Sequence, residues 1–145
     1  MRPREAGQER LTYDASTDSF RDHWGFEPRP YDDWARLHIE SATAGASLQF
    51  LAWDGDEIAG VCLCASHQSG QPGFGWVAVL GVRQPWRRRG LALALLTHSF
   101  AAFRARGFDR VGLGVDAEST TGALELYDRA GMHIDKRQDT YERTL

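Results

Sequence analysis

The sequence predicts a single α/β domain of the α+β type, in which a sheet is flanked by about four helices. Three observations carry this prediction. Strand and helix patterns alternate along most of the chain, hydrophobic residues make up 42% of its 145 residues, and charged residues make up 26%. These proportions are ordinary for a globular protein, and the length suffices for one sizeable hydrophobic core. The expected order is helix, helix, three strands, helix, strand, helix and two strands.

The first half of the chain predicts a polar segment, two helices and a hairpin. Residues 1–18 are polar and are expected to be flexible, and residues 19–145 are expected to form the domain. Gly25 and Pro28 are stop signals for the first helix, whereas the second helix has modest periodicity. The turn Asp54-Gly55-Asp56 predicts the hairpin. The expected elements are helices at Ser19–Phe26 and Tyr31–Ser41, and strands at Gln49–Asp54 and Glu57–Ser66.

The second half predicts strands that alternate with helices. Gly81 interrupts an apolar strand, which indicates a bulge or a close backbone approach. Gly107 and Gly131 each follow a helix pattern, as expected after a helix end. His98 lies off the apolar stripe of its helix and is expected at the surface. The expected elements are strands at Phe74–Val82 and Arg110–Val115, helices at Arg88–Arg106 and Thr121–Ala130, and two short strands within Met132–Leu145.

The cysteine content predicts a cytoplasmic protein with reduced thiols. Cys62 and Cys64 lie two residues apart on a strand, so both side chains face one side. Their spacing fits neither a Cys-x-x-Cys motif nor a set of zinc ligands, and we expect no metal. No apolar run approaches the roughly 20 residues that span a bilayer, and the N-terminus shows no signal-peptide pattern.

A basic turn between a strand and a helix, Arg87-Arg88-Arg89-Gly90-Leu91-Ala92, is the most informative stretch. Unpaired N–H groups and the helix dipole favour an anion at a helix N-terminus. Gly90 lets the anion approach the backbone, and arginines donate to phosphate oxygens in pairs. The turn lacks the Gly-Lys-Ser/Thr ending of a P-loop and the Gly-x-Gly-x-x-Gly pattern of a Rossmann site. We predict that it binds a pyrophosphate.

Two other interpretations of this turn remain. Consecutive arginines often form a solvated face, and a basic patch can bind nucleic acid. The net charge of −3 and the lack of a second basic cluster argue against nucleic acid.

The stretch from Gly75 to Met132 resembles the core of the GNAT family of N-acetyltransferases. Three pieces carry the resemblance in the expected order. Residues 80–92 resemble the family's strand and its Gln/Arg-x-x-Gly-x-Gly/Ala loop, Val115–Ser119 resembles the end of the next strand, and Thr121–Met132 resembles the helix that carries the family's tyrosine. Residues 22–25 and the helix around Trp34 further resemble the second half of tandem actinobacterial members such as mycothiol synthase.

The resemblance implies a mixed, mostly antiparallel sheet that is splayed at its centre and binds acetyl-CoA as co-substrate. The pantetheine arm is expected between the splayed strands, and a backbone N–H near Val82 is expected to polarise the acyl carbonyl. Tyr127 is expected to be catalytic and to protonate the departing thiolate, although periodicity alone favours a core tyrosine. The expected cofactor-binding residues are Leu80, Gly81, Val82, Arg87, Arg88, Arg89, Gly90, Leu91, Ala92 and Ser119.

The chain departs from the family pattern at three places. Ser119 (or Thr120) stands where an asparagine is common. Trp76 occupies the strand position where some members carry a catalytic glutamate. The first strand is not evident, and residues 9–14 are only a weak candidate for it. The remaining candidates for the general base are Asp116, Glu118, His23 and an ordered water.

These expectations together predict an N-acetyltransferase that moves an acetyl group directly to an amine of a small molecule or a peptide. A non-catalytic acyl-CoA-binding domain, one half of a tandem protein, is the first alternative. A site for another phosphate ligand or an acidic partner is the second. We expect no nucleic-acid or membrane partner, and the sequence leaves the acceptor and the oligomeric state open, a homodimer included.

Overall fold

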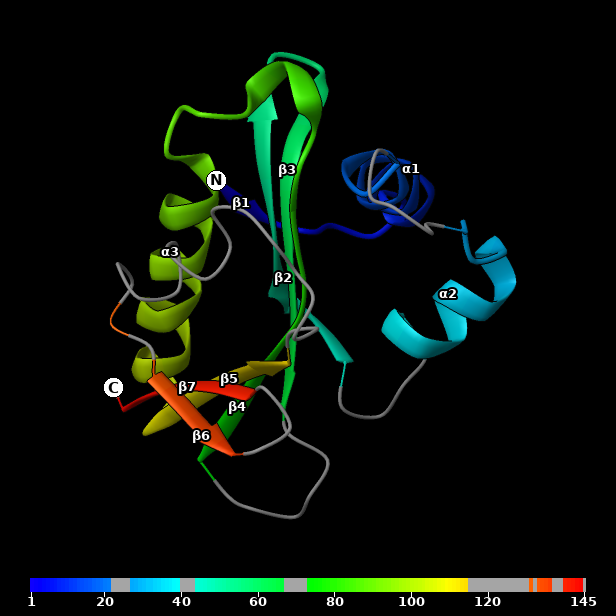
Figure 1. Cartoon of the computed structure of the whole chain (residues 1–145). Helices are drawn as coiled ribbons and strands as arrows, with labels where there is room; N and C mark the ends of the chain where they lie inside the picture. The colour runs from blue at the N-terminus through cyan, green and yellow to red at the C-terminus, as the bar shows by residue number, and fades with distance from the viewer. Residues whose placement is uncertain are drawn as a thin grey trace.

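A seven-stranded sheet runs through the chain, with helices on both of its faces (Figure 1). The computed structural model describes residues 1–21, 27–39, 44–66, 73–114, 131, 133–136 and 140–144. The strand order is β1-β2-β3-β4-β5-β7-β6, and only β4 and β5 pair in parallel. The predicted mixed, mostly antiparallel sheet is therefore confirmed. The strands are β1 (Arg2–Pro3), β2 (Ala44–Asp54), β3 (Glu57–Ser66), β4 (Phe74–Val82), β5 (Arg110–Gly114), β6 (His133–Lys136) and β7 (Thr140–Thr144).

The described helices are α1 (Glu9–Ser19), α2 (Tyr31–His38) and α3 (Leu91–Ala105), with a 3₁₀ turn η1 at Gln84–Trp86. α3 ends as predicted at Gly107, whose φ is 84°. The N–H groups of Gly107 and Phe108 donate to the carbonyls of Arg104 and Phe103, each at 3.0 Å. α3 begins at Leu91 rather than at Arg88. The helix predicted at Thr121–Ala130 lies outside the described residues.

The N-terminal segment corrects the prediction of a flexible region at residues 1–18. It contains β1, which pairs with β2, and α1, which occupies the residues suggested as a weak first strand. Ser19, the expected start of a helix, is instead the last residue of α1. The apolar pattern missed this helix because its buried face carries mainly small hydroxyl residues. Two of these hydroxyl groups donate to backbone carbonyls four residues earlier. The Thr12 hydroxyl donates to the carbonyl of Gln8, and the Ser19 hydroxyl donates to the carbonyl of Ala15.

Helices cover the two faces of the sheet separately. α3 lies on one face and α1 and α2 lie on the other (Figure 1). Each face has its own apolar cluster, because alternate residues of a strand point to opposite sides. The cluster under α3 includes Leu95, Leu96, Phe100, Phe103, Phe50, Cys62, Cys64, Val77, Val111 and Leu113. The cluster under α1 and α2 includes Ala15, Trp34, Leu51, Ile58, Val61 and Leu63.

The two cysteines lie on one face of β3, as predicted, with their sulfur atoms 3.6 Å apart. Both are fully buried, and burial, together with hydrogen bonding and Coulomb repulsion from Cys62, raises the pKa of the Cys64 thiol well above its usual value. We therefore expect iodoacetamide to leave Cys64 unmodified in the folded protein at about pH 8, since the thiolate is the nucleophile. Mass spectrometry should show labelling of Cys64 only after addition of denaturant. Rapid labelling of this thiol in the native protein would contradict its burial.

Candidate functional site

The sheet opens between β4 and β5. The two strands pair from Phe74 opposite Arg110 to Val77 opposite Leu113, and β4 then continues to Val82 without β5. Ala78 marks the point of divergence, because it has no partner in β3 and forms a bulge there. The predicted splay at the centre of the sheet is confirmed. It begins beyond Val77, and the bulge lies at Ala78 rather than at Gly81, where the glycine had indicated a bulge or a close backbone approach.

The backbone of Leu80 and Val82 faces this opening. The N–H of Arg83 donates to the carbonyl of Ala59 in β3 at 2.9 Å, and Gly81 is paired with Val61 of the same strand. Because successive residues direct their backbone groups to opposite edges of a strand, those of Leu80 and Val82 point away from β3. An extended ligand in the opening would meet them as it would meet a neighbouring strand.

Gly81 makes a close approach to α1, one of its two predicted roles. A Cβ at this position would lie 2.7 Å from Ser19 Cβ and 3.1 Å from Phe20 Cε2. The end of α1 therefore rests directly on the backbone of β4, beside the splayed section.

The basic turn brings the chain from the end of β4 to α3. Arg88 and Gly90 both have left-handed backbone, with φ of 65° and 76°, so the helix starts only at Leu91. The first helical bond runs from Ala94 N–H to the carbonyl of Gly90. The N–H groups of residues 91–93 have no acceptor within the part of the chain that the structure describes. Nothing lies within 4 Å of the position of a Cβ on Gly90, so an anion has open access to these donors.

The three arginines of the turn differ in direction. The Arg87 guanidinium points into the protein, where Nε donates to the Val82 carbonyl at 3.0 Å and Nη2 donates to the Ser19 carbonyl at 2.7 Å. Arg88 and Arg89 are exposed. Arg87 thus connects the turn to the end of α1, whereas the charges of Arg88 and Arg89 face the solvent.

Two side chains just before the basic turn also hold this part of the chain in place, and the sequence analysis did not predict their contacts. Arg83 donates from Nε to Asp18 at 2.8 Å and from Nη1 to the Ile58 carbonyl at 3.1 Å. Trp86 Nε1 donates to the Asp54 carboxylate at 2.8 Å. These partners lie far apart in the chain, so no local pattern could have paired them.

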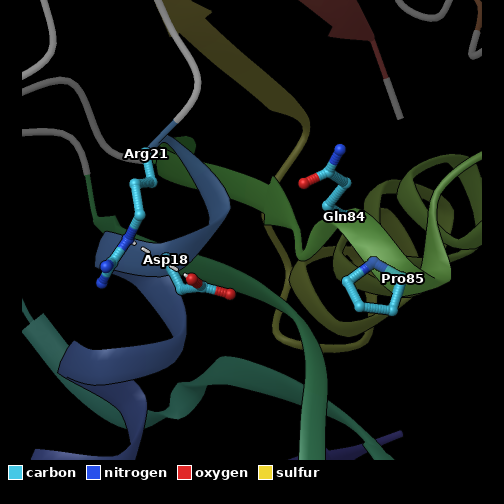
Figure 2. Close-up of a pocket in the computed structure, with 4 residues that line it drawn as sticks. All are labelled: Asp18, Arg21, Gln84 and Pro85. Carbon is cyan, nitrogen blue, oxygen red and sulfur yellow. Dashed lines mark ion pairs between the residues drawn. The ribbon is translucent and has the colours of Figure 1, made fainter.

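A surface pocket of about 340 Å³ lies between the end of α1 and η1 (Figure 2). It is lined by Asp18, Arg21, Gln84 and Pro85. None of these residues was predicted to belong to a site.

Several predicted site residues fall outside the described part of the chain: Tyr127, Ser119, Thr120, Asp116, Glu118 and His23. Trp76 is half-buried beside Phe74, and both rings lie against Gly112 of β5. His98 is exposed, as predicted, and its ring packs edge-on against Phe50. Among the described residues, no group of three His, Cys, Asp or Glu side chains could hold a metal ion, and no helix is long and apolar enough to cross a membrane.

A sequence model of the acetyltransferase (GNAT) family matches residues 10–132, which is most of the chain. This chain belongs to that family. The GNAT relatives include N-alpha-acetyltransferase MAK3 of Arabidopsis thaliana, which is 36% identical over 90 residues, or 62% of this chain and 47% of the plant protein. Mycothiol acetyltransferase of Geodermatophilus obscurus is 39% identical over 85 residues, or 57% of this chain and 27% of that protein.

Solved GNAT structures share the fold. The crystal structure of a GCN5-related N-acetyltransferase from Sphaerobacter thermophilus has a TM-score of 0.78 and 38% identity, covering 99% of this chain and 44% of that chain. A chain in the crystal structure of the NatC complex bound to Gag peptide and CoA has a TM-score of 0.75 and 18% identity. The match covers 99% of this chain and 96% of that chain. The chain spans less than half the length of the two curated relatives and of the Sphaerobacter protein.

Proposed function

We propose that this protein is an acetyl-CoA-dependent N-acetyltransferase that transfers acetyl directly to an amine. The opening between β4 and β5 carries the proposal, because within the described residues it joins a section of β4 that pairs with no strand on that side to a helix N-terminus whose first N–H groups have no acceptor. An extended pantetheine arm would pair with backbone groups of Leu80 and Val82 beside Gly81. The diphosphate would lie on the backbone at Gly90, Leu91 and Ala92. The structure of a GNAT family acetyltransferase from Brucella melitensis is in complex with acetyl-CoA.

The arginines take different roles in this proposal. Arg88 and Arg89 would supply positive charge to the diphosphate from the solvent side. Arg87 would shape the turn, since its donors already meet the carbonyls of Ser19 and Val82. Ser119 would contact the cofactor arm or cap the helix that follows it.

The chemistry is one direct transfer. The unprotonated amine nitrogen attacks the thioester carbon, the carbon–sulfur bond breaks, and Tyr127 gives a proton to the departing thiolate. The nitrogen loses its proton to a base, for which Asp116, Glu118, His23 and an ordered water are the candidates. A covalent acyl-cysteine intermediate is disfavoured, because both thiols are buried under α3. The unjoined thiols fit a reducing compartment, and we place the activity in the cytoplasm.

The acceptor is proposed to be an amine of a small molecule or a peptide. One relative is named an N-alpha-acetyltransferase, others are mycothiol acetyltransferases, and a structural neighbour is the ribosomal-protein-S18-alanine N-acetyltransferase of Escherichia coli. The alternative is a non-catalytic acyl-CoA-binding domain. Trp76 favours it, because an indole cannot take a proton from the amine.

Calorimetry with acetyl-CoA and with ADP tests the cofactor site. We expect acetyl-CoA to bind more tightly than ADP, since only the thioester ligand fills the opening along β4. Release of CoA in the presence of a panel of amines and N-terminal peptides then tests turnover. Binding without turnover on any amine would support the non-catalytic alternative. Equal affinity for ADP would favour a site for another phosphate ligand.

The variant Tyr127→Phe should slow turnover at least about tenfold while leaving the affinity for acetyl-CoA nearly unchanged. The substitution removes only the hydroxyl that would protonate the thiolate. Steady-state rates and calorimetry on the same preparation separate the two effects. An unaltered rate would remove Tyr127 from the mechanism.

A further inference from the structure

One row of paired residues crosses the sheet beside the opening. Trp76 of β4 pairs with Gly112 of β5. Gly112 also pairs with Glu142 of β7, which in turn pairs with His133 of β6. Directly paired residues lie on the same face of a sheet. The row therefore brings an indole, a glycine, an acidic residue and a histidine to one face, across the four strands that lie side by side at this end of the sheet (Figure 1).

The row is on the face opposite to α3. Val111 and Leu113, which flank Gly112 on β5, belong to the apolar cluster under α3, so Gly112 faces the other side. Trp76 alternates in the same way with Val77, another member of that cluster. The face of the row is the one on which α1 and α2 lie (Figure 1). An acceptor can therefore approach it without passing α3, whose N-terminus is proposed to bind the diphosphate.

The row directly precedes the opening. β4 and β5 separate beyond Val77 and Leu113, one residue past the row. β5 and β7 stay paired as far as Gly114 and Thr140, so β7 follows the wall of the opening that lies opposite β4. Neighbouring strands are about 5 Å apart, which puts β7 about 10 Å from β4. An amine between these two strands would be within reach of Glu142, directly or through one water.

Aromatic rings cover the glycine of this row. A Cβ on Gly112 would lie 3.0 Å from the Phe74 ring and 3.1 Å from Trp76 Cζ3, so both rings extend over β5. They offer an acceptor an apolar floor, and neither ring can take a proton. Arg110 is the only ionisable residue of β4 and β5. A base in this row therefore has to come from β7 or β6.

Glu142 is an acidic position among mostly basic ones. Its neighbours on this face are Arg110 of β5 and, on β6, His133 and Lys136. Asp135 lies in the irregular part of β6 and is paired with no residue of β7. Positive neighbours favour an ionised carboxylate, which is the form that accepts a proton.

We propose that Glu142 is the general base of the acetyl transfer. The inference rests on the proposed function. As the amine nitrogen bonds to the thioester carbon, its proton passes to the Glu142 carboxylate and from there to solvent. The carbon–sulfur bond breaks, and Tyr127 protonates the thiolate. Trp76 lies beneath the acceptor in this arrangement, and the base needs no place on β4.

The test compares the dependence of kcat on pH in the native protein, Glu142→Gln and Glu57→Gln. Glu57 is a matched control, because it is an exposed acidic residue at the start of β3. Release of CoA is measured with saturating acetyl-CoA and with the amine of the panel that the native protein acetylates fastest. We expect Glu142→Gln to lower kcat about 100-fold at neutral pH and to lose the decrease of kcat on the acid side, with unchanged affinity for acetyl-CoA in calorimetry. Glu57→Gln should behave as the native protein does.

Glu142→Asp provides a second measurement that does not depend on the folding of Glu142→Gln. It keeps the carboxylate but shortens the side chain, so kcat should fall about tenfold while the decrease on the acid side remains. An unaltered kcat in Glu142→Asp would overturn the assignment. A lower kcat in Glu142→Gln with the native pH dependence would also overturn it, because a merely structural change lowers the rate at every pH alike.

The variants Asp116→Asn, Glu118→Gln and His23→Gln test the competing bases. If one of them loses the decrease on the acid side while Glu142→Gln keeps it, the assignment is wrong and the acetyltransferase proposal stands. The same holds if only His133→Gln loses it, since the base would then lie on β6. If the native protein acetylates no amine of the panel, the proposed function itself fails and this inference fails with it.

Discussion

Replacing Gly90 with glutamate is expected to lower the affinity for acetyl-CoA at least about 1000-fold, or about 4 kcal/mol. The new carboxylate would lie at the N-terminus of α3, where the N–H groups of residues 91–93 have no acceptor among the described residues and are proposed to bind the diphosphate. A resident anion would take these donors and repel the ligand. Calorimetry on the native protein and on Gly90→Glu measures the effect.

Gly107→Glu is the control for this variant. Gly107 lies at the opposite end of α3, has a similar positive φ of 84°, and likewise has nothing within 4 Å of a Cβ position. Both variants therefore carry the same charge and a similar backbone strain of about 1–2 kcal/mol. Only Gly90→Glu should lose binding, and thermal unfolding should show it at least as stable as the control, since a helix N-terminus favours a negative charge. Binding that survives in Gly90→Glu would exclude this turn as the diphosphate site.

Predictions from the sequence were accurate where local patterns determine the structure. The bounds of β3 and β4, the end of α3 before Gly107 and the presence of a turn between β4 and α3 depend on apolar alternation, glycines and a helix start, all of which are local signals. α1 was missed because small hydroxyl residues, rather than apolar ones, form its buried face. No hydrophobic stripe marks such a helix.

The direction of side chains was beyond sequence reasoning for a different reason. All three arginines of the turn have the same chemistry, yet only Arg87 turns inward. Its partner, the Ser19 carbonyl, lies 68 residues away and is brought there by α1 resting on Gly81. The Arg83 pair with Asp18 spans 65 residues in the same way. Such contacts depend on tertiary packing, so they become visible only in the folded chain.

The contact of α1 with β4 predicts that Gly81→Ala lowers both stability and cofactor affinity. The added Cβ would lie 2.7 Å from Ser19 Cβ, which is closer than two carbon atoms can approach without a shift of α1 or β4. Overpacking of this kind costs about 1–3 kcal/mol, which denaturant unfolding measures. Displacement of α1 would also move the Ser19 carbonyl away from Arg87 and Asp18 away from Arg83, so the turn would lose two of its braces. Calorimetry should then show weaker binding of acetyl-CoA.

Ser19→Gly provides the compensating change, because it removes the Cβ and the hydroxyl that the new methyl group would meet. Alone it should cost up to about 1 kcal/mol, the usual effect of glycine in a helix. In Gly81→Ala/Ser19→Gly the remaining close contact is the Phe20 ring at 3.1 Å, which a small rotation relieves. The double variant should therefore be more stable than the sum of the single effects and should bind acetyl-CoA nearly as the native protein does. Additive losses in stability together with unrestored binding would mean that the position of α1 does not support the cofactor turn. Recovery of both would establish that the end of α1 is part of the machinery that shapes the acetyl-CoA site.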